Sequence, residues 1–298
     1  MRMLSIFCLI AILFIVSACS QQTPSHNPSP SNLSLKQNKT ISEVEPDSDN
    51  FILVKGGTIK NKKSNFYGNG EKISSFYIGK NEVTQKEWTE VMGSNPSQFK
   101  SDKLPVEMVS WYDAIEYCNK RSIQEGLKPY YNIIKNKKDS NNKSEYDNLK
   151  WTVTINSGSK GYRLPTEIEW EYAASGGQMS KNYTYSGSNN VNEVAWYWRN
   201  SGDKYLSGNW NWPAIENNHG KTKTAGLNNP NELGLYDMSG NVREWCWNWY
   251  GDSQSGSWRV TKGGGWIGGE SSVQIDFSGK FDPNGIGPDQ GFRVVRSK

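Results

Sequence analysis

Cysteine and histidine, the side chains that most often supply nucleophiles and metal ligands, are scarce in this sequence of 298 residues. The cysteines are Cys8, Cys19, Cys118 and Cys246, and the histidines are His26 and His219. Cys118 and Cys246 could form one disulfide in an oxidising compartment or remain two buried thiols, and their spacing does not decide between these states. His219 alone is too little evidence for a Ser-His-Asp triad. The sequence therefore offers few groups for nucleophilic or redox catalysis.

Two further patterns that could carry chemistry have simpler structural explanations. Glu167, Glu169 and Glu171 form an acidic cluster, but Glu169 closes a helix capping box and Glu167 is favoured electrostatically at the same helix N-terminus. Residues 263–268 match the pattern G-x-G-x-x-G. A dinucleotide site requires a helix after this pattern, whereas the next stretch, Val273–Phe277, alternates as a strand does. We interpret the pattern as a tight glycine turn.

The first residues are typical of an export signal. Arg2 precedes an apolar stretch from Leu4 to Val16, which is shorter than the roughly 20 residues that a membrane-spanning helix needs. Val16-Ser-Ala-Cys19 follows and resembles a bacterial lipobox, in which the cysteine is lipidated. We predict a lipoprotein signal peptide over residues 1–18 and lipidation at Cys19. The alternative is an ordinary secretory signal in which the cysteine falls there by chance.

The segment after Cys19 differs in composition from the rest of the chain. Residues 19–50 are rich in Ser, Pro, Asn and Gln and nearly free of large apolar side chains, which predicts a disordered tether. Residues 51–298 contain no second linker and suit one large domain. The net charge of +4, without a stripe of basic residues, argues against nucleic acid as a partner. We expect a membrane-anchored lipoprotein at the outer membrane or cell surface.

The domain is predicted to contain short elements. Phe51–Val54 and Ser75–Gly79 are predicted strands, and capping residues at Thr84, Ser110 and Thr166 begin three helices. Later strands are predicted at Val194–Trp198, Trp258–Val260, Val273–Phe277 and Phe292–Val295. A few early helices followed by many short β segments indicate an α+β fold with little regular secondary structure and long ordered loops.

Six motifs follow one another in the domain and carry a family resemblance. They are Gly79–Thr84 (GKNEVT), Leu104–Ala114 (LPVEMVSWYDA), Gly161–Ala174 (GYRLPTEIEWEYAA), Gly234–Trp245 (GLYDMSGNVREW), Lys262–Trp266 (KGGGW) and Gly291–Arg293 (GFR). From about Phe51 to Arg296 the chain resembles the formylglycine-generating enzyme (sulfatase-modifying factor) family. The resemblance implies a C-type-lectin-like fold.

The resemblance does not extend to the chemistry of the family. Its oxidase members hold copper on two cysteines after the Gly-Gly turn, and those positions are Gly268 and Val273 in this chain. Copper(I) requires soft sulfur ligands, which neither residue offers. Related sulfoxide synthases hold iron on three histidines, more than this domain contains. We expect no copper, no iron and no catalysis. The alternative is a formylglycine-generating-type oxidase or repurposed enzyme that acts through other residues.

Four residues match positions at which the family binds calcium. Asp237 and Glu244 would supply carboxylate oxygens, and Gly240 and Val242 would supply backbone carbonyls. Hard oxygen ligands suit Ca²⁺, so the resemblance implies a structural calcium ion, although the cation Arg243 lies within the motif. The alternative is that Asp237 caps a turn and Glu244 pairs with a nearby base.

The C-terminal segment has a second resemblance. Arg259–Trp266, then 24 residues, then Gly291–Lys298 resemble the variable region of retroelement-diversified proteins, in particular treponemal variable lipoproteins. In that group Trp266 and Gly291–Arg293 would be scaffold, and the residues between them would contact the ligand. The candidate ligand-binding residues are Ile267, Ser272, Gln274, Asp276, Phe281, Asp282, Asn284, Ile286 and Asp289.

The residue pattern in this segment is compatible with a binding surface. Alternation would send Val273, Ile275 and Phe277 inward and Gln274 and Asp276 outward, and we also expect Asp282, Asn284 and Asp289 to face outward. A loop on a rigid frame can form contacts in this way. We therefore expect a surface-displayed, non-catalytic protein that binds an unknown protein or glycan through residues 267–290. The alternatives are a loop that only packs on its own domain and a structural envelope lipoprotein without a specific ligand.

Overall fold

The computed structural model describes residues 45–251 and 254–298. The predicted signal peptide, Cys19 and the tether up to residue 44 lie outside the described residues. Over the part that is described, no helix is both long enough and apolar enough to cross a bilayer.

Three of the helices in the described residues begin where the local sequence predicts. The helices are α1 (Gln85–Met92), α2 (Trp111–Gln124), α3 (Glu167–Ala174), α4 (Val191–Val194), α5 (Trp212–Asn217) and the 3-10 helix η2 (Gly177–Met179). Thr84, Ser110 and Thr166 are the N-caps of α1, α2 and α3, and each forms a complete capping box. The predicted starts of the three longest helices are confirmed, because a cap needs only residues within one turn.

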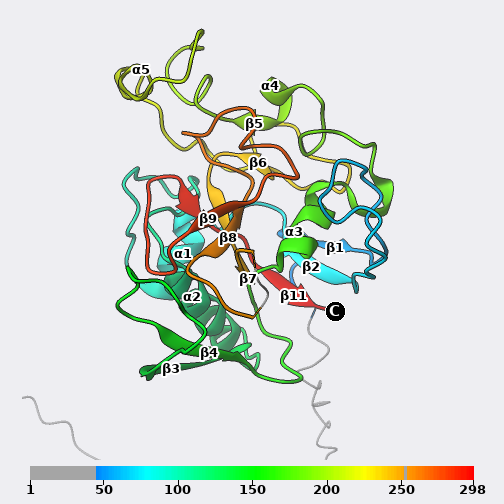
Figure 1. Cartoon of the computed structure of the whole chain (residues 1–298), viewed down its shortest axis with the longest axis vertical. Helices are drawn as coiled ribbons and strands as arrows, with labels where there is room; N and C mark the ends of the chain where they lie inside the picture. Colours follow the sequence, from blue (N-terminus) through cyan, green and yellow to red (C-terminus); the bar gives the residue numbers. More distant parts are fainter. Residues whose placement is uncertain (1–44, 252–253) are drawn as a thin grey trace, which may run out of the picture. The chain divides into compact units, whose positions relative to one another are not determined.

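The strands are short and form small sheets (Figure 1). They are β1 (Phe51–Val54), β2 (Phe76–Gly79), β3 (Tyr131–Lys138), β4 (Trp151–Ile155), β5 (Ala195–Trp196), β6 (Ser239–Gly240), β7 (Arg243–Trp249), β8 (Arg259–Lys262), β9 (Gly279–Phe281), β10 (Gln290–Gly291) and β11 (Val295–Ser297). One sheet has the order β1-β2-β11 and another the order β10-β7-β8-β9, while β3 pairs with β4 and β5 with β6. The predicted α+β class with little regular structure is confirmed.

Strand β7 separates two parts of the core. Trp245 belongs to the cluster that contains α1 and α2, whereas its neighbour Cys246 belongs to the cluster that contains α3. Successive strand residues face opposite sides, so β7 buries a side chain in each cluster. The Trp245 indole donates to the carbonyl of Val109 at 3.0 Å, and the Trp111 indole donates to the carbonyl of Cys246 at 3.0 Å. The β7–β9 sheet is thereby fixed against α2.

Three predicted strands differ in the structure. The predicted strand Phe292–Val295 shares only Val295 with a strand of the structure, β11. Val273–Phe277 forms turns rather than a strand, because Phe277 N donates to the Gln274 carbonyl and Ile275 N donates to the Thr184 carbonyl. Val273 and Ile275 are buried as predicted, but Phe277 is 39% exposed and does not face inward. The predicted strand Val194–Trp198 is reduced to the two residues of β5.

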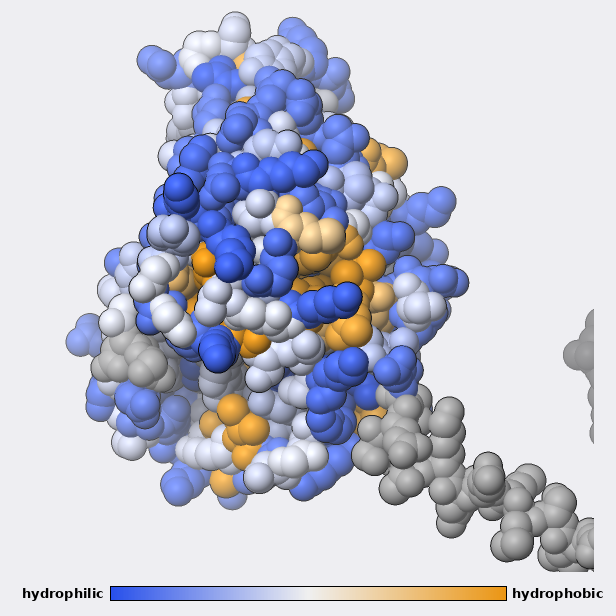
Figure 2. Space-filling model, turned by 90° about the vertical axis from the view of Figure 1, so that its right-hand side faces the viewer, coloured by the Kyte–Doolittle hydropathy of each residue, from blue (hydrophilic) through white to orange (hydrophobic). Residues whose placement is uncertain are grey.

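The face that carries β1 has an apolar hollow of about 310 Å³. It is lined by Ile52, Leu53, Lys55, Gln178, Met179 and Leu233. Figure 2 shows the side of the molecule on which β1, β2 and β11 lie, where apolar side chains gather among hydrophilic ones. This hollow shares no lining residue with the pocket formed by the C-terminal segment.

Candidate functional site

A pocket of about 360 Å³ lies between the glycine turn that follows β8 and strand β9 (Figure 1, orange to red). Its lining residues are Arg243, Gly264, Gly265, Ile267, Gly268, Ser272, Phe277, Gly279, Lys280 and Asp289. Four of these ten are glycines, so a ligand could approach the backbone closely. Most of the lining belongs to the segment that resembles a variable region.

The glycine turn that forms one wall of the pocket depends on the absence of side chains. Gly263 and Gly264 have φ values of 82° and 64°, a conformation that other residues rarely adopt. A Cβ atom on Gly264 would lie 2.4 Å from the carbonyl oxygen of Ser272. No helix follows the turn, as a dinucleotide-binding site would require. Residues 263–268 therefore form a tight turn and not a dinucleotide-binding site.

The charged lining residues are two cations and one carboxylate. Arg243 Nη2 donates to Asp289 Oδ1 at 2.5 Å, and the Arg243 guanidinium lies 5.1 Å from the centre of the Phe281 ring. Lys280 Nζ lies 4.1 Å from the centre of the Trp258 ring. Because Asp289 is paired with Arg243, the lining retains a positive charge at Lys280.

The predicted ligand-binding residues do not gather in one place. Ile267, Ser272 and Asp289 line the pocket. Gln274 and Asp276 lie on a turn that faces another part of the domain, where the Asn65 amide donates to the Asp276 carbonyl.

Four other predicted residues follow or belong to β9. Phe281 packs on Trp245, with ring centroids 6.0 Å apart. Asp282 accepts a hydrogen bond from the Ser144 hydroxyl, and Asn284 Nδ2 donates to Asn148 at 3.0 Å. Ile286 is exposed. Asp282 and Asn284 therefore lie beside the loop between β3 and β4, and none of the four lines the pocket.

The expectation that Asp289 faces outward is wrong. Its side chain is buried, with 4% of the residue exposed, because it pairs with Arg243. Sequence reasoning also missed Arg243, Phe277 and Lys280 as lining residues. The sequence places an arginine at 243 and an aspartate at 289. It does not indicate that these two oppositely charged residues are neighbours.

The remaining cysteines are poorly suited to chemistry. Cys118 and Cys246 are both free and fully buried, which resolves the question of their pairing. Burial raises the pKa of each thiol, so the reactive thiolate is disfavoured. Gly268 lines the pocket, and Val273 is buried next to Gly264.

A serine beside a lysine near the pocket also has a structural explanation. Lys262 Nζ lies 3.2 Å from the Ser278 hydroxyl, but it donates to Glu171 at 2.8 Å in a fully buried ion pair. The pair therefore holds β8 against α3.

The predicted calcium ligands Asp237 and Glu244 are both buried. Glu244 accepts two hydrogen bonds from Arg293, each at 2.6 Å, and a third from the Trp170 indole at 2.6 Å. Asp237 Oδ2 accepts from Gly226 N at 2.7 Å, and Oδ1 has no hydrogen-bond partner among the described residues. Burial raises the pKa of Asp237 to about 6. Glu244 thus pairs with a base, which was the alternative to calcium binding.

These surroundings leave limited room for a cation. Over the described ranges, no group of three or more His, Cys, Asp or Glu side chains is placed to hold a metal ion. The predicted set needs only two carboxylates and two carbonyls, however. A carboxylate offers about four lone-pair positions, of which Glu244 uses three. One acceptor position on Glu244 and Oδ1 of Asp237 are therefore left without a hydrogen-bond donor among the described residues.

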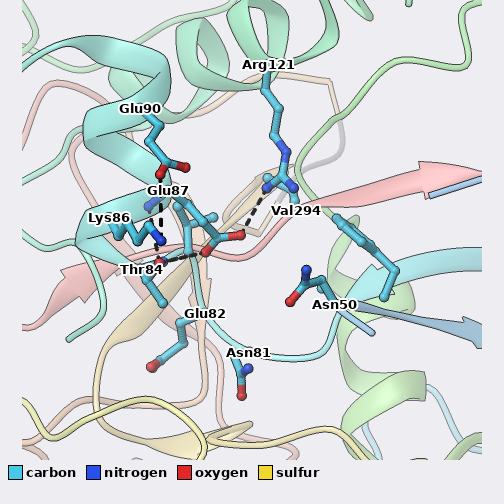
Figure 3. Close-up of a pocket in the computed structure, with 12 residues that line it drawn as sticks. Asn50, Asn81, Glu82, Thr84, Lys86, Glu87, Glu90, Arg121 and Val294 are labelled. Atoms are coloured by element: carbon cyan, nitrogen blue, oxygen red, sulfur yellow. Dashed lines mark hydrogen bonds and ion pairs between the residues drawn. The ribbon is translucent and has the colours of Figure 1, made fainter. Parts of the chain in front are cut away.

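A more polar pocket of about 320 Å³ lies where α1 and α2 approach β1. Figure 3 shows that Glu87 lies between Thr84 and Arg121. Glu87 Oε2 accepts from the backbone and hydroxyl of Thr84 at 2.9 Å, and Oε1 accepts from Arg121 at 3.3 Å. These charged groups already satisfy one another and fix the start of α1, so this pocket is the weaker candidate.

The sequence profile of the sulfatase-modifying factor enzyme 1-like domain matches residues 37–298. The chain therefore belongs to the formylglycine-generating enzyme-sulfatase family, and its fold is the C-type-lectin-like fold of that family.

The individual relatives carry names that describe different functions. The chain is 57% identical to "Chaperone protein LppX" of Paenibacillus barcinonensis over the full length of both proteins. The solved structure of Treponema denticola variable protein 1 has a TM-score of 0.62 and 32% identity, and covers 82% of this chain and 95% of that protein. "Inactive C-alpha-formylglycine-generating enzyme 2" of Bos taurus is 34% identical over 36% of this chain and 33% of its own length. The predicted relation to treponemal variable proteins is confirmed.

Proposed function

We propose that this chain is a lipoprotein, anchored through Cys19 and displayed at the cell surface, whose domain binds a ligand without catalysis. The observation that carries the proposal is the pocket itself. Gly268 lines the pocket, and Val273 is buried and apolar. The resemblance implies that these are the two positions at which oxidases of the family carry copper-binding cysteines. A glycine-lined pocket with a few charged and aromatic groups is suited to binding.

The names of the relatives support this proposal. One relative with high identity over its full length is called a chaperone, and another member is called inactive. A chaperone engages other polypeptides, which favours a polypeptide rather than a glycan as the ligand. The likeness to a treponemal variable protein supports the segment from Ile267 to Gln290 as the contact surface.

Oxygen uptake distinguishes this function from oxidase activity. With copper(I) and a cysteine-containing peptide, the full chain should consume no more oxygen than the buffer, because neither Gly268 nor Val273 supplies a thiolate. An oxygen electrode would measure this, with a formylglycine-generating enzyme as the positive control. Oxygen uptake that scales with the concentration of the chain would contradict the proposal.

We also propose that calcium binds at Asp237 and Glu244 as a structural ion. A ligand that binds only the folded state raises stability by about 2.7 kcal/mol at 100 times its Kd. A chelator should therefore lower the melting temperature in calorimetry, and added Ca²⁺ should restore it. The Asp237→Asn variant should lose most of this response, whereas Asp203→Asn, which removes an exposed carboxylate elsewhere, should keep it. A melting temperature that does not change with the chelator would rule out the ion.

A further inference from the structure

We propose that the pocket recognises an extended polypeptide that pairs with the open edge of β9 and places an acidic side chain against Lys280. The inference rests on the proposed function, which requires only that the pocket binds some ligand. Three features in or beside the pocket support the more specific occupant: an unpaired strand edge, a cation at the rim and exposed aromatic rings.

Strand β9 is the edge of its sheet. The order β10-β7-β8-β9 places it last, and it pairs only with β8, with Val260 opposite Lys280. In the part of the chain that is described, no other strand pairs with its outer side. Gly279 and Lys280 of β9 also line the pocket. An edge strand offers backbone N–H and C=O groups to a polypeptide, and a glycan cannot reproduce that ladder.

Lys280 gives this edge its charge preference. Its side chain is exposed, and none of the described residues places a carboxylate within ion-pairing distance of it. The other charged lining residues, Arg243 and Asp289, pair with each other. An acidic side chain that enters from the edge would therefore find Lys280 as its partner.

Aromatic rings border Lys280 and suit apolar residues on either side of the acid. Lys280 Nζ lies 4.1 Å from the ring centre of Trp258 and 5.3 Å from that of Tyr250. Trp258 and Tyr250 are each 38% exposed, and Phe277 in the lining is 39% exposed. Aromatic side chains of this kind often dominate the energy of protein–protein contacts. The expected ligand is therefore an extended segment with an acidic residue between apolar ones.

Selection from a random peptide library displayed on phage tests the inference. The full chain should enrich peptides that share one acidic position flanked by apolar residues. Lys280→Glu should enrich peptides with a basic residue there, and Lys280→Gln should lose the charge preference. Lys72→Glu, an exposed lysine on the loop before β2 that does not line the pocket, is the matched control and should select as the original chain does. Circular dichroism establishes that each variant is folded.

A second measurement tests the strand pairing. Two N-methylated forms of a selected peptide are compared, one methylated at the odd and one at the even positions. Only alternate N–H groups of a strand face its partner, so one form should bind about tenfold or more weakly and the other should not. Enriched peptides without a shared acidic position, or without a response to Lys280→Glu, would overturn the charge assignment while the binding function stands. Equal affinity of both N-methylated peptides would overturn the strand pairing. A library from which the full chain enriches nothing would overturn the polypeptide ligand altogether.

Discussion

Replacing Arg293 with methionine should lower the free energy of unfolding by about 3–5 kcal/mol. Arg293 is fully buried and donates to both carboxylate oxygens of Glu244 at 2.6 Å. It also donates to the carbonyls of Gly79 at 3.0 Å and Tyr236 at 2.9 Å. Without it, Glu244 is a buried carboxylate that has lost its partner, and three separate segments lose their common contact. Urea denaturation followed by circular dichroism measures the change.

Arg199→Met is the matched control for this prediction. Arg199 pairs with Glu270 at 2.5 Å, but the two side chains are 20% and 40% exposed. Solvent screens such a pair, so its loss should cost much less than the loss of Arg293. Restoring charge balance in the double variant Arg293→Met with Glu244→Gln should recover part of the lost stability. If Arg293→Met costs no more than Arg199→Met, the buried pair does not organise the fold.

Truncating Trp266 or Phe292 to alanine should destabilise the domain by about 3–5 kcal/mol, because each leaves a cavity in the core. Phe292 contacts Tyr117 and Trp88, with ring centroids 5.2 and 6.0 Å apart. The Trp266 ring lies against Phe99, and its indole donates to the carbonyl of Pro288 at 2.8 Å. These two residues frame the pocket segment at its ends. Thermal melts and denaturant titration would give the magnitudes.

Changes within the segment should behave differently. Substitutions at Gln274, Asp276 or Asn284, which are only partly buried, should change stability by no more than about 0.5 kcal/mol. Asp289 is excluded from this group because its buried pairing with Arg243 makes it part of the frame. Comparable losses for the frame and the segment would show that the whole region is core packing.

The sequence predicts the elements that depend on nearby residues. The capping boxes at Thr84, Ser110 and Thr166 involve residues three positions apart, and all three form. Val273–Phe277 was predicted as a strand from its alternation, but two buried apolar residues there are explained equally well by turns anchored at Thr184. Short alternating runs do not determine secondary structure when the partners are distant.

The candidate site was predictable only in part, for the same reason. Ile267 and Ser272 follow the glycine turn in sequence. Both were predicted to contact a ligand, and both line the pocket. Arg243 comes from β7 and reaches the pocket because β10 pairs with β7, which brings Asp289 next to it. Lys280 lines the pocket because β9 pairs with β8. Neither strand pairing could be derived from the sequence, because each joins segments that are far apart.

The central claim is that the segment from Ile267 to Gln290 forms a ligand-binding surface on a stable frame. A library of the full chain varied at the lining residues Ile267, Ser272, Phe277 and Lys280 tests it most directly. The library is displayed on cells and sorted both for folding and for binding to a panel of unfolded polypeptides. Most clones should remain folded, since these side chains are only partly buried or exposed, and different clones should bind different polypeptides. A library in which most clones unfold, or in which all folded clones bind alike, would contradict the account.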